Sequence, residues 1–114
     1  MVLSNPTEEI KMTILRIRKK PVEVTAILWT GTQASTKQVL EFMGQIVDTR
    51  HSVSQDKFHD YCDIVRNQGI EISTLEGPIF ASVGDYIIRG TRNELYPCKP
   101  NVFADCYDVI GDLT

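Results

Sequence analysis

The sequence predicts an α+β fold: a small antiparallel sheet or barrel-like roll with one or two short helices packed on it. Three observations predict it. Residues 21–29 alternate as a strand does, residues 35–44 have the pattern of a capped helix, and short apolar runs between turn residues follow from residue 70. A chain of 114 residues has the size of one domain. We therefore assign residues 12–114 to a single domain, and residues 1–11, which are mostly polar, to an N-terminal extension.

The first expected strand is "PVEVTAILW", residues 21–29. Val22, Val24, Ala26 and Leu28 share one face, and the other face changes from polar to apolar along the strand. The pattern predicts a central strand that becomes buried on both faces towards its end. Trp29, the single tryptophan, is expected to be largely buried, because so large a side chain supplies much of a small core.

A short helix is expected over residues 36–43. Ser35 is a favoured N-cap residue, and Gln38, three positions later, would complete a capping box. Gly44 would end the helix in the left-handed conformation. The string "QIVDT", residues 45–49, follows as a possible strand.

Residues 51–69 leave two interpretations open. They are polar with scattered aromatic side chains, and they fit either a long variable loop or a helix over residues 55–65. Residues 70–110 are expected to be mostly antiparallel β-structure, with a turn at Gly84-Asp85, a corner held by Pro97 and Pro100, a short helical turn and a last strand.

Composition excludes several classes of function. The net charge is −3, whereas general nucleic-acid binders are usually basic. The dense basic run Arg16, Arg18, Lys19 and Lys20 is more typical of a solvated strand entry than of a phosphate contact. The chain has neither the ~20 apolar residues of a membrane span nor the charge and apolar pattern of a signal peptide, which favours a cytoplasmic protein without membrane contact.

The three cysteines are an odd number, which favours free thiols in a reducing compartment. A zinc site would need His59, Cys62, Cys98 and Cys106 together, but their spacing is not that of a zinc knuckle. We expect Cys98 and Cys106 to be packed residues rather than metal ligands. The glycines form no phosphate-binding pattern and the carboxylates no recognisable acid–base pair, so we expect no catalytic residue and no cofactor.

One stretch concentrates groups that suit an anionic, flat ligand. Arg89 and Lys99 would supply charge for phosphate, and Tyr86, Tyr96 and Tyr107 would supply ring faces and hydroxyls. Lys20, the last residue of the basic run, is included as a further positive charge for the ligand. The sequence therefore predicts a ligand-binding site of Arg89, Tyr96, Lys99, Lys20 and Tyr86, if the side chains converge; otherwise the tyrosines pack and the cations are solvated.

Five strings also occur in a recognisable order: "RKKPVEVTAILWTG", "ISTLEG", "ASVGDYIIRG", "ELYPCKPNVF" and "CYDVI". On these strings the chain resembles a family of small phage and prophage proteins whose function is mostly unknown. Val83, Asn101 and Cys106 stand where that family often has Pro, Asp and Thr. The resemblance implies a small accessory protein in the cytoplasm of an infected or lysogenic bacterium.

The preferred function is a non-enzymatic module that binds or sequesters an anionic, nucleotide-like small molecule. The alternative is an interaction or inhibitor module that acts on a host protein through a strand edge or residues 51–69. A zinc- or thiol-dependent enzyme is the third and weakest hypothesis. A homo-oligomer is compatible with each of them.

Overall fold

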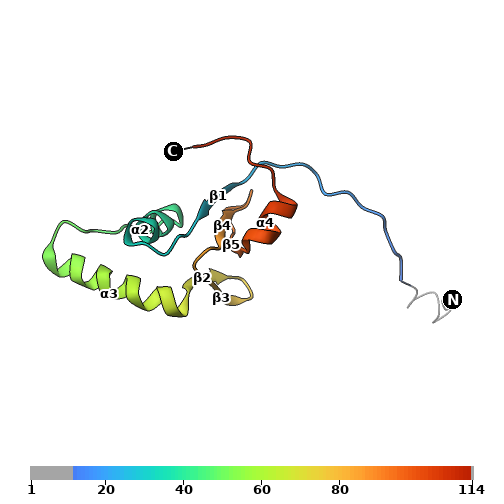
Figure 1. The fold of residues 1–114 in the computed structure, drawn as a ribbon. Helices are drawn as coiled ribbons and strands as arrows, with labels where there is room; N and C mark the ends of the chain where they lie inside the picture. Colours follow the sequence, from blue (N-terminus) through green and yellow to red (C-terminus); the bar gives the residue numbers. More distant parts are fainter. Residues whose placement is uncertain (1–11, 114) are drawn as a thin grey trace.

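Two small antiparallel sheets and three helices make up the part of the chain that the computed structural model describes, residues 12–113 (Figure 1). The α+β class is confirmed, with one helix more than the one or two expected. The predicted N-terminal extension, residues 1–11, lies outside the described residues.

The larger sheet contains β1 (Thr25–Leu28), β4 (Tyr86–Arg89) and β5 (Leu95–Cys98), in the order β1-β4-β5. Strand β4 is central and pairs antiparallel with both neighbours. The prediction of a central strand over residues 21–29 is therefore wrong in position and length. Thr25 already pairs with Arg89, the last residue of β4, so residues 21–24 continue past the end of the strand that could pair with them.

The smaller sheet is a hairpin of β2 (Ile70–Thr74) and β3 (Gly77–Ala81), which lies against β5. Ile70 and Ile72 are buried, whereas Glu71 and Ser73, between and after them, are exposed. This alternation is that of a strand with one face on the core. The expected antiparallel strands in residues 70–98 are thus present, although they divide between two sheets.

Helix α2 (Gln33–Phe42) begins three residues earlier than expected. Thr32 is its N-cap, and the Thr32 hydroxyl accepts a hydrogen bond from the Ser35 N–H at 3.0 Å. Ser35 lies inside the helix and is buried, so the predicted capping box is wrong. Gly44 has φ 93°, the left-handed conformation that was predicted for it. Residues 45–49 form no strand.

Helix α3 (Ser52–Gln68) occupies the segment that the sequence left open. The helical interpretation is right, and the helix extends beyond residues 55–65 at both ends. Of its side chains only Cys62 and Val65 are buried. An apolar stripe this narrow explains why the helical periodicity is weak in the sequence.

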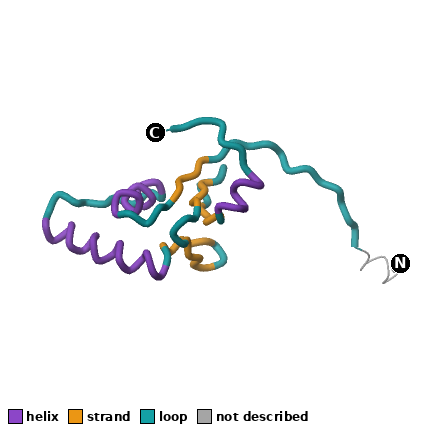
Figure 2. The backbone as a smooth tube through the Cα atoms, viewed as in Figure 1, coloured by secondary structure: helices purple, strands orange, loops and turns teal. Residues whose placement is uncertain are grey.

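Helix α4 (Pro100–Cys106) is the predicted short helical turn, and Pro100 stands at its start, where a missing N–H costs no hydrogen bond. The predicted last strand is absent. Residues 107–113 continue without strand pairing to any other described residue (Figure 2).

The core lies where α2, α3, the hairpin and one face of the larger sheet meet. Trp29 is fully buried there, as predicted, and its indole Nε1 donates to Thr36 Oγ1 at 2.9 Å. The Thr36 hydroxyl in turn donates to the Thr32 carbonyl at 2.7 Å. The main buried apolar neighbours are Val39, Leu40, Val65, Ile70, Ile72 and Ile87.

The outline of residues 12–113 is elongated. Its radius of gyration is 20.3 Å and its extents are 74 × 30 × 22 Å, whereas a compact chain of this length would have a radius of gyration of about 13 Å. Figure 1 shows the reason: the segment before β1 runs away from the rest of the fold. We call residues 12–18 of this segment the arm. No helix among the described residues is long and apolar enough to cross a membrane.

Replacing Thr36 by Val should destabilise the protein by about 1–3 kcal/mol, because the buried indole N–H of Trp29 would lose its acceptor. Thr36→Ser keeps the hydroxyl and serves as the control. Urea unfolding followed by tryptophan fluorescence measures both. A Thr36→Val protein as stable as Thr36→Ser would contradict this account of the core.

Candidate functional site

The larger sheet has two faces with different surroundings. Residues that pair directly across antiparallel strands share a face, so Ile87 and Arg89 of β4 share one face and Tyr86 and Ile88 the other. The Ile87 face packs on the core. Tyr96 pairs with Ile88 and therefore lies on the second face, away from the core. The predicted site residues Arg89 and Tyr96 consequently point to opposite sides of the sheet.

Arg89 belongs to the core side. Its guanidinium donates to the Phe42 backbone carbonyl and lies 5.2 Å from the centre of the Phe42 ring. This carbonyl is at the C-terminal end of α2, where a positive charge is favourable. Arg89 thus joins β4 to α2, and its predicted convergence with Tyr96 is wrong.

Lys99 has a structural partner as well. Its Nζ lies 3.0 Å from Oδ1 of Asp85 and 3.1 Å from Oδ2. Asp85 is buried, and its Oδ2 also accepts the Ser82 N–H at 2.8 Å, as expected of a turn residue. The ion pair connects the turn before β4 to the start of α4 and takes Lys99 away from Tyr96 and Lys20.

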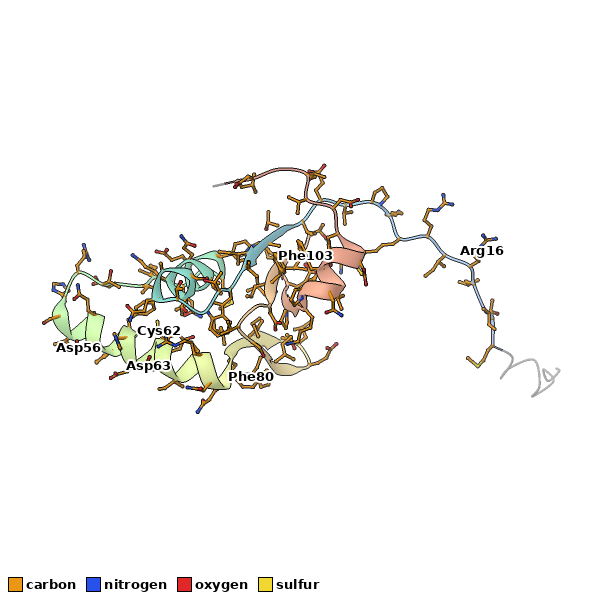
Figure 3. The ribbon with its side chains drawn as sticks, in the orientation of Figure 1. Arg16, Asp56, Cys62, Asp63, Phe80 and Phe103 are labelled. Carbon is orange, nitrogen blue, oxygen red and sulfur yellow. The ribbon has the colours of Figure 1, made fainter. Side chains whose placement is uncertain are left out.

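Tyr86 packs against α4. Its ring stacks on Phe103 with 3.7 Å between centroids and 6° between planes, and Phe103 stacks on Tyr107 at 5.4 Å and 24° (Figure 3 labels Phe103). This three-ring stack attaches α4 and the start of the C-terminal segment to the second face of the sheet. One face of the Tyr86 ring is therefore already covered by a neighbour.

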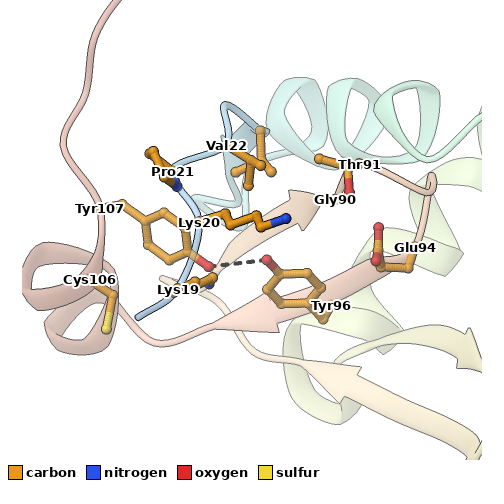
Figure 4. A pocket seen from close by; sticks show the side chains of 11 residues that line it. Lys19, Lys20, Pro21, Val22, Gly90, Thr91, Glu94, Tyr96, Cys106 and Tyr107 are labelled. Carbon is orange, nitrogen blue, oxygen red and sulfur yellow. Dashed lines mark hydrogen bonds between the residues drawn. The ribbon is translucent and has the colours of Figure 1, made fainter. Parts of the chain in front are cut away.

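Two predicted site residues do converge, Lys20 and Tyr96. They line a pocket of about 330 Å³ on the second face of the sheet, which we call the Lys–Tyr pocket (Figure 4). In Figure 4 the Lys20 side chain extends towards the turn that carries Gly90 and Thr91. The full lining is Lys19, Lys20, Pro21, Val22, Val24, Gly90, Thr91, Glu94, Tyr96, Cys106 and Tyr107.

The hydroxyls of Tyr96 and Tyr107 lie 3.1 Å apart at this pocket (Figure 4). Burial raises the pKa of Tyr96 far above its ordinary value, and the hydrogen bond with Tyr107 adds to the shift. Tyr96 therefore stays protonated at neutral pH. Two hydroxyls need only one proton for their mutual hydrogen bond, so the second O–H is left to donate to a ligand.

Glu94 is the acidic side chain in the lining, and the turn engages it. Its Oε1 accepts the Arg92 N–H at 2.9 Å, and its carboxylate lies so close to Gly90 that a Cβ there would collide with it. Because Gly90 has no side chain, the Glu94 carboxylate can lie over the turn that connects β4 and β5. The carboxylate closes the loop between β4 and β5.

Lys19 and Tyr107 were not among the predicted site residues. Lys19 could have been found from its place in the basic run beside Pro21, which starts an extended segment. Tyr107 was recognised in the sequence as a source of a ring face and a hydroxyl, but its place at the pocket depends on α4 turning the chain back over the sheet.

A second hollow of about 690 Å³ continues from the Lys–Tyr pocket, and we call it the groove. The two share Pro21, Val22, Val24, Cys106 and Tyr107. On one side the groove is bordered by residues 21–24 and on the other by residues 107–111, with Ala26, Tyr86, Ile88 and Phe103 also lining it. Its walls are mainly apolar, with Glu23 and Asp108 as the charged members.

The cysteines carry free thiols. Cys62 and Cys98 are buried, and burial raises the pKa of each thiol. Cys106 is exposed at the pocket, so the prediction that it is packed is wrong; it is the last residue of α4, a helix that has no buried residue. Within residues 12–113 no three His, Cys, Asp or Glu side chains gather as metal ligands would.

Comparison with protein-family models, with curated proteins and with solved structures finds no match. The likeness of the sequence strings to small phage proteins therefore stays a prediction. The geometry of the Lys–Tyr pocket is what bears on function.

Asp85→Ala should destabilise the protein by about 1–3 kcal/mol, because the Ser82 N–H and the Lys99 ammonium both lose their partner. Lys99→Ala should cost less, within about 1 kcal/mol, because the lysine side chain is 59% exposed. Asp60→Ala, at an exposed position on α3, is the control. Equal losses for Asp85→Ala and Lys99→Ala in urea unfolding would show instead that Asp85 depends on the charge of Lys99.

Proposed function

We propose that this protein is a non-enzymatic binding module that holds an anionic, nucleotide-like small molecule in the Lys–Tyr pocket. The observation that carries the proposal is the meeting of two lysines with a hydrogen-bonded pair of tyrosine hydroxyls around one hollow. The phage accessory role and the cytoplasmic setting come from the resemblance of the sequence strings, and they are part of the proposal.

The polar groups of the pocket favour an anion. Lys19 and Lys20 supply two positive charges, and each ammonium has three donors. The Tyr96–Tyr107 pair adds a neutral O–H, which can donate to a phosphate or carboxylate oxygen. Hydrogen bonds of this charge-assisted kind are shorter and stronger than neutral ones.

The size and the walls of the pocket favour a small ligand with a flat part. Binding sites for small molecules usually enclose about 300–1,000 Å³, and the Lys–Tyr pocket, at about 330 Å³, is at the lower end. Its apolar side is formed by Pro21, Val22 and Val24, and Tyr107 contributes a ring. A phosphate near the lysines would place an attached ring system against these apolar groups.

Holding the ligand fits the pocket better than turning it over. Glu94 is hydrogen-bonded to its own turn, and the raised pKa of Tyr96 makes it a poor base at neutral pH. Cys106 is the nucleophilic side chain of the lining, and no histidine stands among the lining residues to activate it.

The alternative, an interaction or inhibitor module for a host protein, is favoured by α3. This helix exposes Val53 and Ile64, with 64% and 51% of their surface open. An amphipathic helix with apolar side chains on its outer surface is a common protein-docking element.

Calorimetric titration with inorganic phosphate, pyrophosphate, AMP and a cyclic mononucleotide tests the proposal. We expect the wild type to bind at least one of the nucleotides, and Lys20→Ala to bind it roughly ten- to a hundredfold more weakly, the equivalent of one charge-assisted hydrogen bond. Lys57→Ala on α3 is the matched control, since it removes an exposed lysine away from the pocket.

Arg89→Ala separates this site from the one predicted from the sequence. It should lower stability, through the lost contacts with Phe42, and leave ligand affinity unchanged. If the wild type bound none of these compounds, the proposed function would be wrong and the protein-interaction module would be favoured instead. Binding that Lys20→Ala leaves intact would place the ligand outside the Lys–Tyr pocket.

A further inference from the structure

Two extended segments border the groove without a partner strand. Residues 21–24 lie along one side of it, residues 107–111 contribute to the other, and neither pairs with another strand among residues 12–113. Val22, Glu23 and Val24 alternate as in a strand, and residues 107–111 are extended and contain Val109 and Ile110, which are exposed. Between these two extended segments there is space for a further strand, and the apolar walls of the groove would bury one face of it.

The outer edge of β1 is open at Ala26, whereas at Leu28 the backbone carbonyl accepts the Ser35 hydroxyl of α2 at 3.4 Å. The Trp29 N–H donates to the Asp85 carbonyl, so the backbone groups of Trp29 face β4. Backbone direction alternates along an antiparallel strand, which turns the N–H and C=O of Ala26 away from β4. Ala26 is also exposed and lines the groove. An unpaired strand edge of this kind is a template for an added strand.

The arm has the composition of a missing strand. Ile14 and Ile17 are 92% and 84% exposed, and Leu15 is 71% exposed. In the string Leu15-Arg16-Ile17-Arg18 apolar and basic side chains alternate, which is the pattern of a strand with one buried and one solvated face. Figure 3 shows Arg16 on the arm, away from the rest of the fold.

Charge complements this fit. Arg16 and Arg18 give the arm a charge of +2, so the rest of the chain, by difference from the net −3, carries −5. The charged side chains of the groove are Glu23 and Asp108, both acidic. A strand that places Leu15 and Ile17 on the apolar wall would bring its arginines towards these carboxylates.

The arm of the same chain is poorly suited to fill the groove. To pair with residues 21–24 it would have to reverse direction at Lys19-Lys20. Two-residue hairpin turns require positive φ, which Gly and Asn supply, and the string "RKKPV" contains neither. Pro21 further restricts Lys20 to an extended conformation. The arm therefore leads away from its own groove.

We propose that the groove takes the arm, residues 12–18, of a second copy of this chain. The exchange is reciprocal, and the two arms and two grooves form a dimer with twofold symmetry. An extended arm of seven residues spans about 23 Å, which is enough to lie along residues 21–26 of a partner. The inference does not rest on the proposed ligand: it is argued from the open edge of β1, the exposed apolar side chains of the arm and the charges of the groove, although the groove and the Lys–Tyr pocket share part of their lining.

Sedimentation equilibrium of the full chain, without ligand, tests the proposal. Between about 1 and 100 μM, where μM association is measurable, we expect a mass twice the 12.9 kDa of the chain. The double variant Leu15→Asp, Ile17→Asp should shift the mass to that of one chain. Ile46→Asp, at a site 96% exposed in the loop after α2, is the matched control and should remain dimeric.

A second set of variants reverses the charges of the groove and of the arm, so that loss of the dimer can be distinguished from loss of the fold. The variant Glu23→Lys, Asp108→Lys should be monomeric, and the further changes Arg16→Glu and Arg18→Glu in the same chain should restore the dimer. Circular dichroism confirms that each variant is folded. A monomeric wild type, a dimer that survives the arm variant, or a charge variant that is not rescued would each overturn the exchange. The pocket and the groove share Pro21, Val22 and Val24, so the Lys20→Ala titration is run on the wild type and on the arm variant to test anion binding separately.

Discussion

The pairing of β4 with both β1 and β5 is the constraint on which the rest of the structure depends. It decides which side chains face the core and which face the Lys–Tyr pocket, because direct partners across the three strands share a face. It also decides how far β1 can extend. Since β4 ends at Arg89, opposite Thr25, the chain before Thr25 leaves the sheet and becomes a wall of the pocket and the groove.

Two sets of side-chain contacts hold the helices α2 and α4 against this small sheet. On the core side, Trp29 donates to Thr36 at the start of α2, and Arg89 contacts Phe42 at its end, so that one helix is held at both ends. On the other side, the stack of Tyr86, Phe103 and Tyr107 holds α4. The sheet therefore separates the core from a second side that carries the aromatic stack, the Lys–Tyr pocket and the groove.

The sequence predicted the parts that depend on local pattern. The α+β class, the burial of Trp29, the left-handed Gly44 and the turn role of Asp85 follow from periodicity and turn chemistry, and the structure has all of them. The sequence-based prediction failed where the formation of a strand depends on the presence of a partner strand. Residues 21–24 alternate as a strand does but have no neighbour to pair with, and residues 107–110 repeat the case at the other end of the chain.

The candidate site shows the same division. Lys20 and Tyr96 could be proposed from residue type alone, and the pocket contains both. Arg89 and Lys99 were equally suitable by type, but one has a helix end as its partner and the other a buried carboxylate. Sequence proximity could not reveal this, because Phe42 lies 47 positions before Arg89.

The alternation along β4 has a consequence for how such a protein can change. Tyr86 and Arg89 are three residues apart, yet they belong to opposite sides of the sheet with separate neighbours. Substitutions at pocket-side positions such as Ala26 or Tyr96 can reshape the hollow while the interior keeps its packing, since sites without shared contacts have nearly additive effects. A lineage or a designer could thus vary the lining of the hollow and inherit the same scaffold.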